Sequence, residues 1–337
     1  MRIVWLMVVL GVAFAGWFWK NSIVPATDGN VGQARKVTVS KLGPRYVTGH
    51  TSHYDLAISP DGSIWSVGYD GENYGLVSRL DVGTKSWQRT KYTNRFAMPE
   101  AIAFPSASTG VIVARSQFFN TMDGGQNWQR FELRSYLTPV AIDFWNEEIG
   151  VVVGRHNVSN EQRMEVWRTD DGGRSFAKFA ELRSDRFPYD VIFLSSSEII
   201  MVVAKDELMR SRDGGKTWSP ERFELFSVSS AVRKSDSQTL LLGTEGEVAT
   251  SDNVNGWTMT SLISRTANSL VWRDIACIGG SVIVAVGDKG SLAVSFTGGV
   301  EWADVQSGIG EDLVRIYSGP DFFVILGTDS MFRLDLE

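Results

Sequence analysis

The residues best placed to do chemistry are acids that recur near the start of short apolar segments. They are Asp55, Glu100, Asp190 and Asp274. Two carboxylates about 5–10 Å apart across a cleft can hydrolyse a glycosidic bond. Acids repeated at one register can equally accept hydrogen bonds from backbone N–H groups or pair with a neighbouring arginine. Because these acids follow a repeat, a structural role is favoured, and a ligand-binding or catalytic role is the alternative.

Three cations recur at another place in the same repeat. Arg115, Arg155 and Lys205 each follow an apolar run in consecutive repeat units, and Arg163 lies in an irregular insertion beside Arg155. Together they predict a basic crescent on one face that could dock an acidic loop, a carboxylate or a lipid phosphate of a partner. The alternative is that these cations pair with Glu100 and Asp190 or are solvated.

Other kinds of chemistry find little support. His50 and His53 have a spacing that could bind a metal, but only Asp55 stands nearby as a third ligand, so no metal site is predicted. Cys277 is the single cysteine and lies in an apolar run, which predicts a small buried side chain. No motif for a nucleotide or other cofactor is present. A net charge of −6 argues against nucleic acid as a partner.

An eight-residue pattern, here called the octad, is repeated along the chain and ends in an aromatic residue. A Ser or Thr and an Asp can bond local backbone N–H groups, glycines can adopt positive φ, and the aromatic ring can pack on adjoining strands. We interpret the octads as structural turns. Their key residues are Asp123, Gly125 and Trp128; Asp171, Gly173 and Phe176; Asp213, Gly215 and Trp218; Asp252 and Trp257; Gly299 and Trp302.

The spacing of the octads indicates the architecture. Their aromatic residues stand at positions 87, 128, 176, 218, 257 and 302, a period typical of β-propeller blades. Each unit also has an apolar segment expected to be a buried strand, and seven such segments can be counted. The last unit ends without an octad, and the alternating segment 35–42 can supply its missing outer strand. We predict an all-β, seven-bladed propeller over residues 36–337, closed by that N-terminal strand.

The N-terminus has the composition of a targeting segment. Arg2 precedes an apolar run from Ile3 to Trp19, which predicts one apolar helix. Residues 1–26 are therefore expected to be a signal peptide or a signal anchor, and residues 27–35 a linker. The protein is expected to be exported as a monomer. It would stay anchored on the periplasmic side of the inner membrane, or be periplasmic or secreted after cleavage.

The octads resemble those of the BNR, or Asp-box, repeat superfamily. The fuller unit, with Val286-Gly-Asp-Lys-Gly290 ahead of an octad, is similar to the photosystem II assembly and stability factor family, which includes non-photosynthetic bacterial relatives. This resemblance implies a non-catalytic, extracytoplasmic factor that binds membrane-protein partners through an arginine-rich surface. Sialidases also carry octads, but Arg186-Phe-Pro188, the one Arg-x-Pro present, follows the third octad rather than preceding the first. A carbohydrate-active enzyme or glycan-binding propeller is the alternative function.

Overall fold

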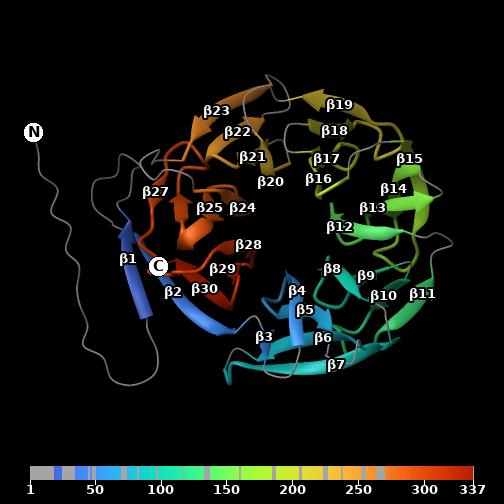
Figure 1. Ribbon diagram of the computed structural model, residues 1–337, viewed down its shortest axis with the longest axis horizontal. Helices are drawn as coiled ribbons and strands as arrows, with labels where there is room; N and C mark the ends of the chain where they lie inside the picture. Colours follow the sequence, from blue (N-terminus) through green and yellow to red (C-terminus); the bar gives the residue numbers. More distant parts are fainter. Residues whose placement is uncertain are drawn as a thin grey trace, which may run out of the picture.

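The protein is a ring of seven antiparallel β-sheets arranged around a central axis, and we use the word channel for the region that the innermost strands surround (Figure 1). The computed structural model describes residues 19–24, 35–44, 46–47, 51–69, 74–81, 83–95, 98–115, 117–132, 137–158, 161–183, 187–204, 207–222, 227–236, 238–251, 256–262 and 270–336. Its sheets carry four or five strands each. The prediction of an all-β, seven-bladed propeller is therefore confirmed.

The first three blades each have four strands ordered from the channel outward, and blade one has a short fifth strand. Blade one consists of β4 (Thr51–Ile58), β5 (Ile64–Tyr69), β6 (Tyr74–Asp81) and β7 (Ser86–Arg95), with the short β3 (Tyr46–Val47) paired to β4. Blade two consists of β8 (Pro99–Ala103), β9 (Gly110–Ala114), β10 (Gln117–Thr121) and β11 (Gln129–Glu132). Blade three consists of β12 (Thr138–Phe144), β13 (Gly150–Val158), β14 (Glu161–Thr169) and β15 (Ala177–Arg183).

The next three blades follow the same order. Blade four consists of β16 (Asp190–Phe193), β17 (Ile199–Ala204), β18 (Glu207–Ser211) and β19 (Ser219–Arg222). Blade five consists of β20 (Val228–Ser235), β21 (Gln238–Gly243), β22 (Glu247–Ser251) and β23 (Trp257–Ser261). Blade six consists of β24 (Trp272–Ile278), β25 (Val282–Gly287), β26 (Leu292–Ser295) and β27 (Ala303–Asp304), with the 3-10 turn η1 (Asp288–Gly290) between β25 and β26.

Blade seven joins the two ends of the described chain. Its strands are β28 (Leu313–Ser318), β29 (Phe322–Gly327) and β30 (Ser330–Leu336), followed by β2 (Arg35–Pro44) and β1 (Trp19–Val24). Strand β2 pairs antiparallel with β30, from Val37 opposite Leu336 to Pro44 opposite Ser330. Figure 1 shows these blue and red strands side by side.

The predicted N-terminal helix falls mostly on residues outside the described ranges. Its last part belongs instead to β1, which pairs with β2. Within the described residues, no helix is long and apolar enough to cross a membrane.

The core is formed where neighbouring blades pack face to face. The second strand of each blade is buried on both faces, as β9 and β29 show along their whole length. Between blades one and two, the rings of Trp65 and Phe104 stack with centroids 4.8 Å apart. The blades are therefore held together mainly by burial of apolar surface between sheets.

The octads form the turns between third and outer strands. In blade four, the Ser211 hydroxyl and the Thr217 N–H both donate to Oδ1 of Asp213, each at 2.9 Å, and the Thr217 hydroxyl donates to Oδ2 at 2.6 Å. The N–H of Gly215 donates to the Ser211 hydroxyl at 2.8 Å. The octads at Asp123 and Asp171 make the equivalent bonds. In the last octad the Thr297 hydroxyl replaces the carboxylate, while Asp252 lies outside the described residues.

Because successive strands are antiparallel, the seven innermost strands all begin at the same end of the channel. We call this end the strand-start mouth, and the hairpins between second and third strands open there too. The opposite end, where the inner strands finish and the octad turns lie, is the octad mouth. The two groups of predicted residues therefore separate, with acids and cations near one mouth and octads near the other.

Candidate functional site

The inner strands share a β-bulge that sets which side chains line the channel. Register shifts occur at this place in six of them, for example between His53 and Asp55 in β4 and between Trp272 and Asp274 in β24. A bulge redirects the following side chain. In each blade one residue of the inner strand follows this place and pairs with the same position of the second strand. We call these seven equivalent residues the channel ring: Asp55, Ala101, Ala141, Asp190, Ser230, Asp274 and Arg315.

Two ring acids are tied to the next blade. Oδ2 of Asp55 accepts the backbone N–H of Ile102 at 3.0 Å, and its Oδ1 accepts the hydroxyl of Tyr317 at 2.7 Å. Burial raises the pKa of Asp55, against the lowering effects of Arg315 and these bonds. Asp55 thus fastens blade one to blades two and seven.

Asp274 is bound in the same way. Its Oδ2 accepts the N–H of Ile316 in blade seven at 2.8 Å, and its Oδ1 accepts the Ser230 hydroxyl of blade five at 2.5 Å. Burial again raises the pKa of this carboxyl, and Arg315 opposes the shift. Both Asp55 and Asp274 therefore have the bonds that a structural role requires.

Asp190 differs from these two acids. Within the described part of the chain, its carboxyl accepts one hydrogen bond, from the N–H of its neighbour Val191 at 2.9 Å. Burial raises the pKa of Asp190 to about 7, Arg315 lowers it, and the negative charge of Asp274 raises it further. Asp190 is the ring acid with spare capacity to accept hydrogen bonds.

Arg315 is a ring residue that the sequence interpretation missed. It makes no direct hydrogen bond or ion pair with the described residues, but its positive charge lowers the pKa of Asp55, Asp190 and Asp274 against the effect of burial. Its side chain is exposed to the channel although the ring of blades surrounds it. Aligning the seventh inner strand with the other six would have found it.

Glu100 does not belong to the ring, which corrects its predicted register. It occupies the bulge between Pro99 and Ala101, one residue before the ring position. Burial raises the pKa of its carboxyl, while the charges of Arg115 and Arg155 lower it. Arg115 is exposed, and the Arg155 guanidinium lies 4.8 Å from the ring centroid of Phe187. Two of the predicted cations therefore share an environment with Glu100.

The other two predicted cations are placed differently. Arg163 forms an ion pair with Glu181 on the outer strand of blade three, away from the channel. Lys205 lies outside the described residues. Beside Arg163, the buried Glu165 accepts bonds from His156 at 2.9 Å, Trp167 at 2.9 Å and Lys178 at 2.7 Å, an internal network that stabilises the long hairpin.

Exposed apolar side chains stand around the strand-start mouth. Tyr189 is 58% exposed just before Asp190, Tyr54 is 37% exposed just before Asp55, and Val271 is 39% exposed ahead of β24. Sequence reasoning missed them because an exposed tyrosine and a buried one look alike in an apolar strand. The mouth thus combines aromatic surface with cations and acids.

Metal and thiol chemistry find no support among the described residues. These residues contain no group of three potential metal ligands, and the His50 and His53 side chains lie outside them. Cys277 is partly buried, and burial raises the pKa of its thiol, so the reactive thiolate is disfavoured.

The comparisons with known proteins agree with this architecture. No family model and no curated protein matches the chain. Among solved structures, YCF48 from Cyanidioschyzon merolae superposes with a TM-score of 0.66 at 17% identity, over 87% of this chain and 97% of that one. YCF48 bound to a D1 peptide gives the same TM-score of 0.66 at 17% identity, over 94% and 96%.

A glycoside hydrolase is similar in fold as well. The GH74 xyloglucanase from Xanthomonas campestris has a TM-score of 0.62 at 14% identity, and the match covers 94% of this chain and 53% of that one. At these identities the likeness concerns the fold. The chain therefore shares its propeller fold with YCF48, as the resemblance of its octads predicted, and also with GH74 enzymes.

Proposed function

We propose that this propeller is a non-catalytic scaffold that binds a segment of a protein partner across its strand-start mouth. The observation that carries the proposal is the exposed Tyr189, which directly precedes the ring residue Asp190 and follows Phe187, the aromatic residue that Arg155 covers. Tyrosine and arginine are enriched where protein partners bind, because they combine apolar area with hydrogen bonding. A similar propeller, YCF48, has been solved with a D1 peptide bound, which supports a peptide as the ligand class.

The electrostatics of the mouth favour a partner segment with acids at its edge. Arg115 is exposed, and the Arg155 guanidinium is held over Phe187. A partner carboxylate could bind these guanidinium groups in a bidentate geometry. The three ring acids deeper in the channel would repel an anion, so the acidic part of the segment belongs on the rim, with apolar side chains over Tyr189.

Affinity purification from solubilised membranes tests this proposal. The bait is the full chain with Arg115, Arg155 and Lys205 all changed to Glu, or with Tyr189→Ala, each compared with the unchanged protein. The matched control is Arg212→Glu, an exposed cation beside the octad Asp213. Partners recovered with the unchanged chain and Arg212→Glu should be lost with the triple variant. Full recovery with the triple variant would remove the crescent from the binding surface.

We further propose that the chain is exported, acts as a monomer and meets a membrane-associated partner on the periplasmic side of the inner membrane. The apolar run from Ile3 to Trp19 supports export. N-terminal sequencing of the mature protein distinguishes a cleaved signal peptide from a retained anchor.

We also propose that β2 closes the ring in solution. Deletion of residues 19–44 should then lower the melting temperature strongly.

A second candidate function is action on a carbohydrate at the same mouth. The observation in its favour is Asp190, whose pKa of about 7 suits a general acid and is raised in part by the nearby carboxyl of Asp274. The fold likeness to GH74 enzymes leaves this candidate open. A glycosidase screen with the unchanged chain and with Asp190→Asn decides the question, because hydrolysis that survives the substitution excludes Asp190 as the acid.

A further inference from the structure

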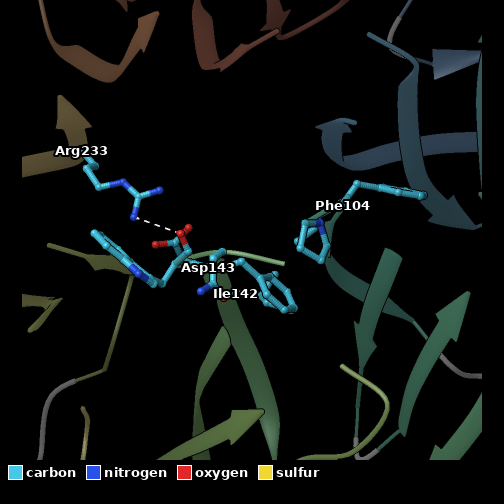
Figure 2. A pocket seen from close by; sticks show the side chains of 9 residues that line it. Phe104, Ile142, Asp143 and Arg233 are labelled. Atoms are coloured by element: carbon cyan, nitrogen blue, oxygen red, sulfur yellow. Dashed lines mark hydrogen bonds between the residues drawn. The ribbon is translucent and has the colours of Figure 1, made fainter. Parts of the chain in front are cut away.

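A hollow of about 290 Å³ lies at the octad mouth, where the inner strands of blades two and three end. Its walls are formed by Phe104, Pro105 and Ile142, and its polar side by Asp143 and Arg233. Figure 2 shows Arg233 reaching toward Asp143 from one side, with Phe104 on the other. The hollow is at the small end of ligand pockets, which hold about 300–1,000 Å³, so it suits one small ring.

Asp143 and Arg233 both depart from the repeat. The position of Asp143 is occupied in the other blades by Ala57, Ala103, Ile192, Val232, Ala276 and Tyr317. The position of Arg233 is occupied by Ile58, Phe104, Phe144, Phe193, Cys277 and Ser318. This acid and this cation are therefore not part of the repeat, and within the described residues they occur together at this end of the channel.

The two charged groups are held in place but keep capacity for a ligand. Oδ2 of Asp143 accepts the N–H of Phe193 at 2.8 Å, which fixes the carboxyl at the wall. The Arg233 guanidinium lies 4.5 Å from the ring centroid of Trp145 and donates to its carbonyl oxygen at 3.5 Å. Within the described residues that is the one hydrogen bond of a group with five N–H donors.

The balance of charge indicates the class of ligand. Burial raises the pKa of Asp143, and the positive charge of Arg233 lowers it, so each group partly neutralises the other. A charged ligand would upset this balance inside a partly buried hollow. A neutral polyol would not, because each hydroxyl donates to the carboxylate and accepts from the guanidinium. The apolar walls at Phe104, Pro105 and Ile142 suit the C–H face of a ring.

We propose that this hollow binds one neutral sugar ring, either free or at the end of a glycan. Asp143 accepts a hydrogen bond from one hydroxyl group of the sugar, and Arg233 donates a hydrogen bond to the adjacent hydroxyl group. The amide of Asn146 stands at the rim, and its oxygen already accepts the N–H groups of Glu148 at 2.9 Å and Ile149 at 2.7 Å. The site is separate from the strand-start mouth, so it does not depend on the proposed partner binding.

Calorimetric titration of the full chain with methyl glucoside, galactoside, mannoside and xyloside tests the proposal. A glycan array with the same chain distinguishes a free sugar from a glycan end. At least one glycoside should bind, and Asp143→Asn and Arg233→Met should each weaken it roughly tenfold or more. Asp143→Asn keeps an oxygen for Phe193, and Arg233→Met keeps an apolar stem on Trp145, so both should preserve the fold.

Glu301→Gln is the matched control, because it changes an exposed acid of the last octad that does not line the hollow and should leave the affinity unchanged. If circular dichroism shows that either variant is unfolded, Ala103→Phe replaces it as a variant that fills the hollow. The proposal is overturned if no glycoside or arrayed glycan binds, or if binding survives all folded variants of the hollow. It is also overturned if Asp190→Asn alone removes binding, which would place the sugar at the strand-start mouth.

Discussion

Asp213 at an octad turn and Asp190 in the channel ring belong to the same blade, yet their carboxyls are shifted in opposite directions. Bonds from the side chain and N–H of Thr217 hold the pKa of Asp213 at about 2, with little burial to oppose them. Burial raises the pKa of Asp190 to about 7, and Asp190 has a single hydrogen bond from the described residues. An ionised aspartate therefore stabilises the fold at the octad turn, whereas burial in the channel ring disfavours the ionised form of Asp190.

This contrast separates structural acids from candidate functional ones. An acid whose two carboxylate oxygens both accept bonds from its own turn or from neighbouring blades serves the architecture, as at Asp213, Asp55 and Asp274. An acid held in a desolvated place without such donors costs stability. Perturbed carboxyls of this kind cluster at functional sites, although structural networks also produce them. Among the ring acids, Asp190 meets this description.

The largest expected effect is on the structural side of the comparison. Gly125 has φ +83° in its octad turn, and a Cβ there would lie 2.3 Å from Cη2 of the buried Trp65. Gly125→Ala should lower the free energy of unfolding by about 4 kcal/mol, from backbone strain and overpacking together. Urea unfolding followed by tryptophan fluorescence measures the change.

Gly256→Ala is the control for this prediction. Gly256 has φ +89° but none of the described residues lies within 4 Å of its Cβ position, so strain alone should cost about 1 kcal/mol. Equal losses for the two variants would show that the contact between the octad and the neighbouring blade contributes little, which would contradict the structural role assigned to the turn.

Sequence reasoning predicted the fold because octads and apolar second strands are local signals, repeated often enough to set the blade period. It also placed Asp55, Asp190 and Asp274 at one register. It misplaced Glu100 because a bulge of one residue cannot be seen in the sequence. It missed Arg315 because the seventh unit lacks the octad that aligned the others.

The pair of Asp143 and Arg233 was beyond the reach of the sequence for a different reason. These residues stand on blades three and five, and they meet at the channel end because the ring curves. Contacts across blades depend on side-chain reach and on the exact closure of the ring. A repeat pattern carries no information about either, since it describes what the blades share.

A second prediction concerns Asp190→Asn. A folded pKa of about 7 against an ordinary value of 3.8 means that ionisation destabilises the folded state, by about 4 kcal/mol in full and about 3 kcal/mol after allowance for channel water. The contribution of Asp190 to the stability of the unchanged protein should therefore be most favourable below about pH 4. This contribution is lost as the pH rises from 4 through 7. Asp190→Asn should be more stable than the unchanged protein at pH 8, with no difference at pH 4.

Asp274→Asn sharpens this prediction. Asp274 accepts bonds from both Ile316 and Ser230, and an amide provides one acceptor oxygen in place of two. The lost bond should offset the relief of charge, so Asp274→Asn should be no more stable than the unchanged protein at pH 8. Thermal unfolding of both variants across pH 4–8 makes the comparison. If Asp190→Asn and Asp274→Asn gain the same stability at pH 8, the cross-blade bonds of Asp274 do not distinguish it from Asp190.

The smallest expected effect is that of Asp213→Asn. The amide keeps one acceptor oxygen but loses the charge that strengthens the bonds from Ser211 and Thr217, so the free energy of unfolding at pH 7 should fall by about 1 kcal/mol. A pKa lowered to about 2 gives stability that is present above the ordinary value of 3.8 and is lost as the pH falls through 2. The difference between Asp213→Asn and the unchanged protein should therefore shrink below pH 3, the reverse of the trend at Asp190. Urea unfolding at pH 7 and pH 2.5 measures it, and an Asp213→Asn variant that is more stable than the unchanged protein at pH 7 would mean that the turn carboxylate is strained in the way that the channel carboxylate is.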